Sequence, residues 1–366
     1  MIYYGLQILH PSIFLPACII ICAIISLATG SSWTTSATVG IALIGIGKVL
    51  GIPVGMVAGA VISGAYFGDK LSPLSDTTNL APAMAGGELF SHIRYMTLTT
   101  VPSIIVTLIV FFIISFTQTT AGTADIDSLM LAIKDKFTIN FSLFLVPAVV
   151  VFLIVRKAPP LVALLIGTLL GGLYALIFQK DILIEVAQSS GFSFEVAYKG
   201  IMNAITVATE VKTTNPLLND LFSSGGMEGM LGTIWLIMCA MVFGGIMDAI
   251  GALARISNAL LSWATSTFQL FASTVASCLA INLTASDQYL SLVIPGKMFA
   301  EAYKKRGLAP ENLSRTLEDS GTVTSVLIPW NTCGAYQSGV LGVGVGEYFI
   351  YAIFNWLSPF MTLLYA

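Results

Sequence analysis

Charged residues are scarce in this chain. Of its 366 residues, only 10% are Asp, Glu, Lys or Arg, less than half of the roughly 25% that is usual in soluble domains. Hydrophobic residues make up 56% and gather in long runs. This balance excludes an ordinary soluble domain. The net charge is −3 and the few basic residues sit in short loops rather than in a patch, so nothing indicates a nucleic-acid partner.

Cysteine and histidine are also few, which bears on metal and cofactor chemistry. The two histidines, His10 and His92, stand alone near the ends of apolar runs, so we interpret them as interfacial residues. Five cysteines lie inside apolar segments without metal-ligand spacing and are interpreted as small core residues: Cys18, Cys22, Cys239, Cys278 and Cys333. The sequence therefore predicts no resident cofactor.

What is abundant is apolar sequence long enough, or nearly long enough, to cross a bilayer. The longer runs lie at about 12–28, 98–116, 139–155, 160–178, 229–250 and 339–363, and shorter ones at 37–47, 53–67, 267–281 and 288–300. This pattern predicts an all-α, polytopic membrane protein.

One polar stretch, 68–82, interrupts these runs with two carboxylates, Asp69 and Asp76, and one lysine, Lys70. An ionisable group at bilayer depth costs roughly 2.5–3.5 kcal/mol on insertion scales, so such groups persist mostly along ion or substrate paths. The aspartates are therefore candidates for function. Asp is also a good helix N-cap, and for each aspartate this structural role stays open.

The chain shows two halves with the same order of features. A polar tip at 29–36 is followed by the interrupted segment 68–82, and a tip at 282–288 is followed by a second interruption at 319–334. Paired, proline-broken segments are typical of transporters built from inverted repeats with discontinuous helices. Freed carbonyls, hydroxyls and carboxylates together are ligands for a small hard cation. The pattern thus predicts a cation site.

Basic residues are placed unequally, as an inverted arrangement requires. The link after the second tip carries Lys304, Lys305, Arg306 and Arg315, whereas the link after the first carries only Lys48. Cytoplasmic loops are richer in Lys and Arg, so we expect the second link inside and the first outside.

The two polar segments resemble those of a known family. Gly30-Ser31-Ser32-Trp33 and the run Gly68 to Pro82 are similar to segments of NhaC-type sodium/proton antiporters, and the similarity continues through Gly232 to Trp235, Gly244 to Met247 and Ile328 to Thr332. The resemblance implies exchange of Na⁺ for H⁺ across a bacterial inner membrane, and it allows a homodimer. Related sequences include sodium-linked malate/lactate exchangers, so the substrate stays open.

We expect Na⁺ and H⁺ to compete for Asp69, Asp76 and Asp319, because a carboxylate taken out of water readily holds either cation. Neutral oxygens would come from both interruptions: Ser75, Thr77, Asn79, Thr322 and Asn331. The opposing hairpin tips would be formed by Ser32 and Thr34 with Asn282 and Thr284.

A chemically different alternative is an intramembrane serine hydrolase. Its nucleophile would lie in Gly30-Ser31-Ser32-Trp33, and His92 is the one candidate for the base that such a serine needs. The position of His92 beside Arg94 near a span end makes this the weaker hypothesis.

We divide the chain into the remainder of a first repeat (1–117), a short extramembrane connection (118–138) and a second repeat (139–366) with an extramembrane segment at 179–228. Between the two halves, Asp319 is matched to Asp69 (319 − 69 = 250) and Asn282 to Thr29 (282 − 29 = 253). At this offset the counterpart of the span 160–178 would precede residue 1. We therefore expect the first repeat to lack its opening helices, and exchange by this chain alone to be weak.

Overall fold

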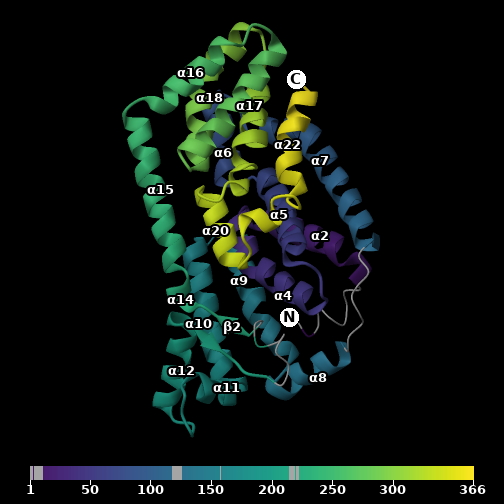
Figure 1. Cartoon of the computed structure of the whole chain (residues 1–366), viewed down its shortest axis with the longest axis vertical. Coiled ribbons are helices and arrows are strands. Elements are labelled where there is room, and N and C mark those ends of the chain that lie inside the picture. The colour runs from purple at the N-terminus through teal and green to yellow at the C-terminus, as the bar shows by residue number, and fades with distance from the viewer. Residues whose placement is uncertain (1–2, 4–10, 118–125, 157, 214–218, 220–221) are drawn as a thin grey trace. The chain divides into compact units, whose positions relative to one another are not determined.

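The computed structural model describes residues 3, 11–117, 126–156, 158–213, 219 and 222–366. Within these residues the chain is helical almost throughout, as predicted (Figure 1). One strand pair was not predicted: β1 (Thr209–Glu210) runs antiparallel to β2 (Ser223–Ser224). The all-α prediction holds apart from these two short strands.

Four described helices are long and apolar enough to cross a membrane: Leu89–Phe116, Leu161–Phe178, Gly226–Ala249 and Thr267–Thr284. The helices Met130–Lys136 and Phe141–Leu153, which meet at 89°, form a fifth candidate if they are one bent span. The chain is thus a multi-pass membrane protein. The span predicted at 339–363 is wrong as one helix, because the chain turns at Gly342 (φ 64°), and a separate helix begins at Ile353.

The chain divides into two compact units. The first combines Met1–Pro11, Ala42–Ile52 and Thr119–Gly232. Its elements after residue 119 are α8 (Ile126–Lys136), the 3-10 turn η2 (Phe141–Phe144), α9 (Leu145–Val155), α10 (Pro160–Phe178), α11 (Lys180–Val186), α12 (Phe194–Thr206), β1, β2 and α14 (Gly226–Gly229). The short helices α11 and α12 occupy the segment for which an extramembrane location is predicted.

The second unit combines Ser12–Ile41, Pro53–Gln118 and Thr233–Ala366. Its first set of elements is α2 (Pro11–Thr29), α3 (Ser32–Thr35), the π-helical turn η1 (Ser36–Gly40), α5 (Val54–Leu71), α6 (Asp76–Ala85) and α7 (Leu89–Thr117). The helix α4 (Ile41–Val49) follows η1 and lies largely in the first unit. The later elements are α15 (Leu231–Ala249), α16 (Ala252–Ser262), α17 (Thr267–Thr284), α18 (Gln288–Lys305), α19 (Pro310–Leu317), the π-helical turn η3 (Glu318–Thr322), the 3-10 turn η4 (Ser325–Leu327), α20 (Thr332–Leu341), α21 (Val345–Tyr348) and α22 (Ile353–Leu364).

Element boundaries in the second unit recur at a constant separation along the chain. The N-cap of α6 is Ser75 and that of α20 is Asn331, and both helices end at a left-handed glycine, Gly86 and Gly342. The differences in position, 331 − 75 and 342 − 86, are equal, and we call this value the repeat separation. Polar caps and left-handed glycines are ordinary helix boundaries, so the same local signals are used twice.

A buried contact recurs at the repeat separation as well. The Ser26 hydroxyl donates to the Ala65 carbonyl at 2.5 Å, and the Asn282 amide donates to the Gly321 carbonyl at 2.6 Å. The differences 282 − 26 and 321 − 65 both equal the repeat separation. The smaller offsets taken from the sequence were therefore wrong. They paired Asp69 with Asp319, whereas the element boundaries pair Asp69 with Ser325.

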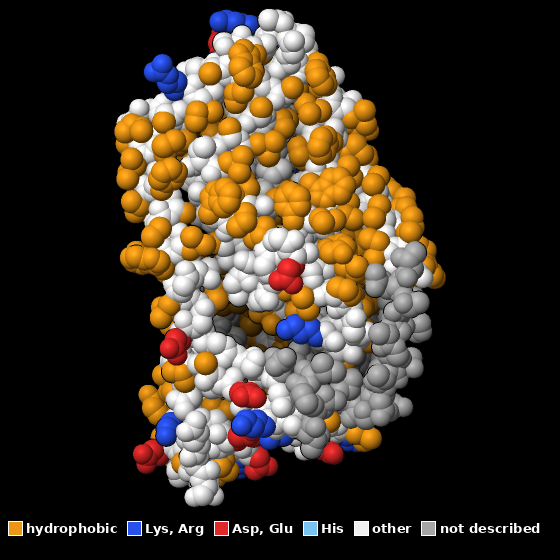
Figure 2. Space-filling view, viewed as in Figure 1, with side chains coloured by type: hydrophobic (Ala, Val, Ile, Leu, Met, Phe, Trp, Pro, Cys, Tyr) orange, Lys and Arg blue, Asp and Glu red, His pale blue; other side chains and the backbone are white. Residues whose placement is uncertain are grey.

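Large apolar side chains remain on the outside of the candidate spans. In α7 six of the exposed ones recur along one helix face: Leu98, Val101, Ile105, Ile109, Phe112 and Phe116. Figure 2 shows hydrophobic side chains over much of the face in view. Such a surface suits a lipid environment. Among the five cysteines, Cys239 is exposed rather than part of the core, and the other four are buried as predicted.

Candidate functional site

The first break separates α5 from α6 by only a short segment, Ser72 to Ser75. Ser75 caps α6 by accepting from the Thr78 amide. The Thr78 hydroxyl donates to the carbonyls of Asp69 (3.3 Å) and Lys70 (3.1 Å) at the end of α5, and the Asp69 carbonyl also accepts from the Ser72 amide at 3.0 Å. The break is thus narrower than the predicted interruption 68–82, and its freed carbonyls are partly satisfied.

Asp69 lies in the last turn of α5 and is 8% exposed. Its Oδ2 accepts hydrogen bonds from the Ser32 amide at 3.0 Å and the Ser32 hydroxyl at 2.7 Å. Its Oδ1 has no hydrogen-bond partner among the described residues. The structure therefore brings one predicted tip residue onto one predicted aspartate and leaves that carboxylate an oxygen with which to bind a cation.

Asp76 differs, because its side chain is exposed at the start of α6. Its Oδ1 accepts from the Thr77 amide at 2.8 Å, and its Oδ2 accepts from the Tyr289 hydroxyl. Asn79 is exposed too and donates to the Ser75 carbonyl at 2.6 Å. The expected burial is found for Asp69 and Asp319 but not for Asp76.

The second break is longer and more buried. It begins with the π-helical turn η3, continues through η4 and ends at Asn331, the N-cap of α20. The amide of Asn331 donates to both the carbonyl and the Oδ1 of Asn282 at 3.2 Å. Asn282 in turn donates to the Gly321 carbonyl and to the Thr324 hydroxyl at 3.2 Å. Asn282, from the second predicted tip, is therefore hydrogen-bonded to residues of the second break.

An ion pair connects the two breaks. The Lys70 ammonium contacts Asp319 Oδ1, and both side chains are fully buried. The hydroxyl of Ser358 in α22 donates to the same Asp319 oxygen at 3.0 Å and lies 3.3 Å from the Lys70 nitrogen. A buried pair is costly to break, because removing one partner leaves a charge in a medium of low polarity. Lys70 joins the site as the partner of Asp319, and Ser358 is a residue that sequence reasoning missed.

Glu318 was missed as well. It lies beside Asp319 in η3, is 0% exposed and interacts electrostatically with Lys70, Asp69 and Asp319. No described residue forms a hydrogen bond with normal geometry to either of its carboxylate oxygens. Two adjacent acidic residues, 318 and 319, would have indicated Glu318 as a candidate in the sequence. It was missed because the predicted second interruption began at residue 319.

The predicted ligands do not form one compact metal cluster. Among the described residues, no three His, Cys, Asp or Glu side chains come together as ligands of a single ion. Thr34 bonds to the Ser31 hydroxyl at 3.1 Å, and Thr284 to the Ala280 carbonyl of its own helix at 2.7 Å. The hydroxyl of Thr322 is buried and has no partner within the part of the chain that is described.

The serine hydrolase hypothesis fails on geometry. Ser32 donates to Asp69, whereas His92 Nδ1 bonds to the Ser314 hydroxyl at 2.7 Å. No nucleophile–base pair therefore forms between Ser32 and His92. His92 is 0% exposed, so its interpretation as interfacial was wrong. The other histidine, His10, lies outside the described residues.

Arg315 was counted as a loop charge but is buried in α19, 1% exposed. Its guanidinium carbon lies 5.0 Å from the ring centre of Tyr95 and 5.8 Å from that of Phe271. The difference in basic residues between the two links is accordingly smaller than the sequence indicated.

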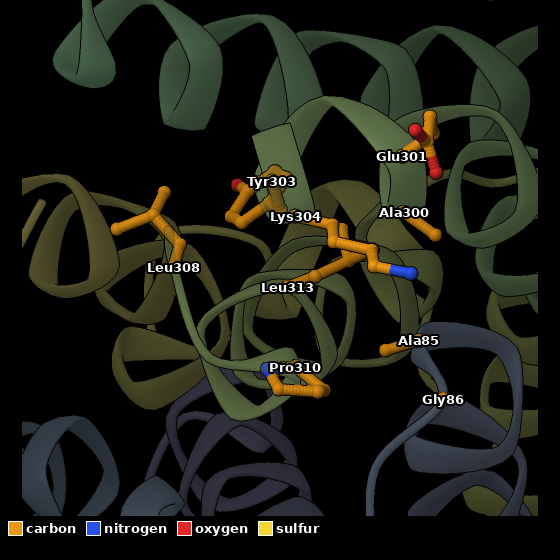
Figure 3. Close-up of a pocket in the computed structure, with 9 residues that line it drawn as sticks. All are labelled: Ala85, Gly86, Ala300, Glu301, Tyr303, Lys304, Leu308, Pro310 and Leu313. Atoms are coloured by element: carbon orange, nitrogen blue, oxygen red, sulfur yellow. The ribbon is translucent and has the colours of Figure 1, made fainter. Parts of the chain in front are cut away.

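A pocket of about 370 Å³ lies at the far end of α6 from Asp76 (Figure 3). Its lining comes from α6, α18 and α19 and their ends: Ala85, Gly86, Ala300, Glu301, Tyr303, Lys304, Leu308, Pro310 and Leu313. Figure 3 shows Lys304 extended across it. None of the predicted site residues lines this pocket. A ten-residue helix rises about 1.5 Å per residue, so roughly 15 Å separate the two ends of α6.

Broken helices, buried carboxylates and an apolar exterior together define a membrane transporter rather than an enzyme. A family model described as "Na+/H+ antiporter family" matches residues 64–366. The chain belongs to this family of secondary transporters.

Individual relatives agree with that assignment. "Na(+)/H(+) antiporter NhaC" of Alkalihalophilus pseudofirmus is 40% identical over 370 residues, which cover 100% of this chain and 76% of the relative. The protein of the same name from Bacillus subtilis is 36% identical over 366 residues, with 100% and 78% covered. The "Malate-2H(+)/Na(+)-lactate antiporter" of Bacillus subtilis is 38% identical over 362 residues, with 98% and 73% covered.

Proposed function

We propose that this chain exchanges Na⁺ for H⁺ across the cytoplasmic membrane of a bacterium by competition of the two cations at buried carboxylates. The observation that carries the proposal is Asp69. It is buried, keeps one carboxylate oxygen free of partners among the described residues, and directly precedes Lys70, whose ion pair with Asp319 joins the two breaks. A cation entering beside Asp69 would therefore act at the junction of both broken segments.

The other predicted ligands take different positions in this scheme. Asp76 is exposed and interacts electrostatically with Asp69, so it would attract Na⁺ before the ion is desolvated. Asp319, held by Lys70 and Ser358, would respond to the charge at Asp69 rather than hold Na⁺ alone. Neutral oxygens from Ser75, Thr77 and Thr322 would complete the coordination, because sodium accepts hydroxyl and carbonyl ligands.

The constant repeat separation supports alternating access through two related halves. If the halves are inverted in the membrane, movement of one against the other would expose the junction at Asp69 first to one side and then to the other. An inverted arrangement of the halves would also place the chain after the first polar tip and the chain after the second on opposite sides of the membrane, as predicted from their basic residues.

A second candidate function is sodium-coupled exchange of small carboxylates. Two observations favour it: a relative named as a malate and lactate antiporter, and the buried guanidinium of Arg315, whose Nε and Nη2 have no hydrogen-bond partner among the described residues. A buried guanidinium suits a carboxylate ligand. Lys70 is less suited to this role, because Asp319 already engages it.

The test is proton release from everted membrane vesicles, followed with a pH-sensitive dye, on separate addition of sodium, lithium, potassium or malate. We expect a response to sodium that the Asp69→Asn variant lowers by about a hundredfold or more, since the change removes the charge that both cations share. Normal membrane insertion of the variant is the control. Full exchange by Asp69→Asn, or a response to malate alone, would contradict the proposal.

A further inference from the structure

The pocket between α6, α18 and α19 has no role in the scheme above. Most of its lining is apolar, and two of the lining side chains are fully buried, Leu313 and Tyr303. The Tyr303 hydroxyl shares a hydrogen bond with Thr274 at 3.1 Å. Two charged side chains complete the lining, Glu301 and Lys304. A cavity of about 370 Å³ thus combines an apolar interior with one carboxylate and one ammonium group.

The two charged side chains of the pocket are available to a ligand. Glu301 and Lys304 are one turn apart in α18, and side chains at this spacing begin about 5–6 Å from each other. Lys304 forms no ion pair with a described residue. Glu301 lies 3.8 Å from Lys305, with both side chains about two-thirds exposed or more, and such a pair contributes little. Figure 3 shows Lys304 across the pocket and Glu301 at its margin.

The pocket lies at the level where two candidate spans begin. Gly86 is part of its lining, and the span in α7 begins shortly afterwards at Leu89. The ring of Tyr303 lies 5.2 Å from that of Phe271, close to Thr267, where the span in α17 begins. The ends of spanning helices lie at the boundary between hydrocarbon and water. The pocket is therefore within reach of lipid headgroups.

Residues typical of that boundary lie beside the end of α18. Trp263 is 71% exposed, and the carbonyl of the next residue, Ala264, accepts from the Arg306 guanidinium at 2.7 Å. Exposed tryptophan and basic side chains are enriched at the membrane–water interface. This neighbourhood supports the same position for the pocket.

We propose that the pocket binds the headgroup of a zwitterionic phospholipid of the phosphatidylethanolamine kind. The lipid phosphate accepts from the Lys304 ammonium, the lipid ammonium donates to the Glu301 carboxylate, and an acyl chain covers the apolar lining. Two carbon atoms join phosphate and ammonium in this headgroup, which suits two opposite charges one helical turn apart. An anionic phospholipid would bring a phosphate to Lys304 but would leave Glu301 facing negative charge.

This site is separate from ion exchange but adjoins the helices that lead to both breaks. The helix α6 begins at the cap of the first break, Ser75, and α19 continues directly into η3 of the second break. A lipid seated between the other ends of these helices stabilises their contact. The inference goes beyond the proposed function, and its test measures binding without transport.

The experiment is native mass spectrometry of the full chain purified in detergent. Phosphatidylethanolamine, phosphatidylcholine and phosphatidylglycerol with identical acyl chains are added separately, as is soluble glycerophosphoethanolamine. We expect phosphatidylethanolamine to bind most tightly, because the trimethylammonium group of phosphatidylcholine has no N–H to donate to Glu301.

Variants of the two charged side chains should separate their roles. Lys304→Ala should weaken binding of phosphatidylethanolamine and phosphatidylglycerol by about tenfold. Glu301→Gln should weaken phosphatidylethanolamine by a similar factor without weakening phosphatidylglycerol. Both side chains are exposed, so the variants should fold, and their melting temperatures without added lipid check this. Glu195→Gln and Lys199→Ala, at exposed charges one turn apart in α12, are the matched controls and should change nothing.

Other outcomes overturn the inference. Equal binding of the three lipids would mean unspecific lipid contact, and tighter binding of phosphatidylglycerol to the wild type would make the site anionic-lipid specific. Binding of glycerophosphoethanolamine as tight as that of the lipid would indicate a soluble ligand. Ala300→Phe places a ring in the pocket without altering either charge, and undiminished lipid binding by this variant would place the lipid elsewhere.

Discussion

The two breaks of the second unit share a plan but differ in how they are stabilised. At the first break, one serine cap and the Thr78 hydroxyl satisfy the backbone, and Asp76 is exposed. At the second, two buried asparagines, Asn282 and Asn331, bond to each other and to the unwound backbone. The first break therefore has an exposed charged end, whereas the second is held by a network of buried hydrogen bonds.

The ionisable residues of the site are where the halves diverge. Shifted by the repeat separation, Asp69 and Lys70 correspond to Ser325 and Val326, and Asp76 corresponds to Thr332. In the other direction, Glu318 and Asp319 correspond to Ile62 and Ser63. Each half thus supplies charged groups at positions where the other has none. The charged residues of the candidate site therefore lie at positions that differ between the two halves.

Breaking the ion pair between Lys70 and Asp319, which joins the two halves, should have the largest effect on stability. Lys70→Ala leaves Asp319 buried without its cation, at a cost of about 3–5 kcal/mol. We expect poor yield and a lower melting temperature in detergent, measured by fluorescence-detected gel filtration. The double variant Lys70→Met with Asp319→Asn removes both charges and should recover most of the stability. A single variant as stable as wild type would show that the ion pair does not support the fold.

A matched pair of changes sharpens the comparison between the halves. Asn282→Ala removes the hydrogen bonds to Gly321, Thr324 and Asn331, and we expect a loss of about 1–3 kcal/mol. Ser26→Ala, at the corresponding position of the first half, removes one hydrogen bond to Ala65 and should cost about 0.5–1.5 kcal/mol. Thermal unfolding of the purified variants measures both. Equal losses would mean that the second break is no more firmly held than the first.

The smallest effect on stability is expected at the exposed end of the first break. Asp76→Asn keeps the size of the side chain and removes an exposed charge, so the melting temperature should stay unchanged. If Asp76 attracts sodium toward Asp69, half-maximal exchange should need about three- to tenfold more sodium, most clearly at low ionic strength. Exchange measured over a range of sodium concentrations tests this, and an unchanged concentration dependence would exclude the role.

Several features followed from the sequence because they depend on local chemistry. The membrane class came from long apolar runs, and the breaks from proline and polar residues that a helix in lipid does not tolerate. Burial of Asp69 was expected because a carboxylate in an apolar run is expensive wherever the chain places it, and Asp319 was selected as its expected counterpart in the second half. The two polar tips were visible for the same reason.

Other features needed the fold. The repeat separation was missed because the two acidic positions compared, Asp69 and Asp319, do not correspond between the halves. The sequence could not assign Arg315 to a buried ring contact, since a charge near a helix end usually faces water. It could not show that Asp76 is exposed either.

The sequence by itself determined that the chain is a multi-pass helical protein with polar breaks, because burial of charge and satisfaction of the backbone are local costs that composition reveals. Only the tertiary structure decided which charges meet. Lys70 and Asp319 are far apart in the chain and in contact in the fold, and Glu318 is isolated from donors among the described residues. Contacts between distant segments are set by packing, and no periodicity in the sequence encodes them.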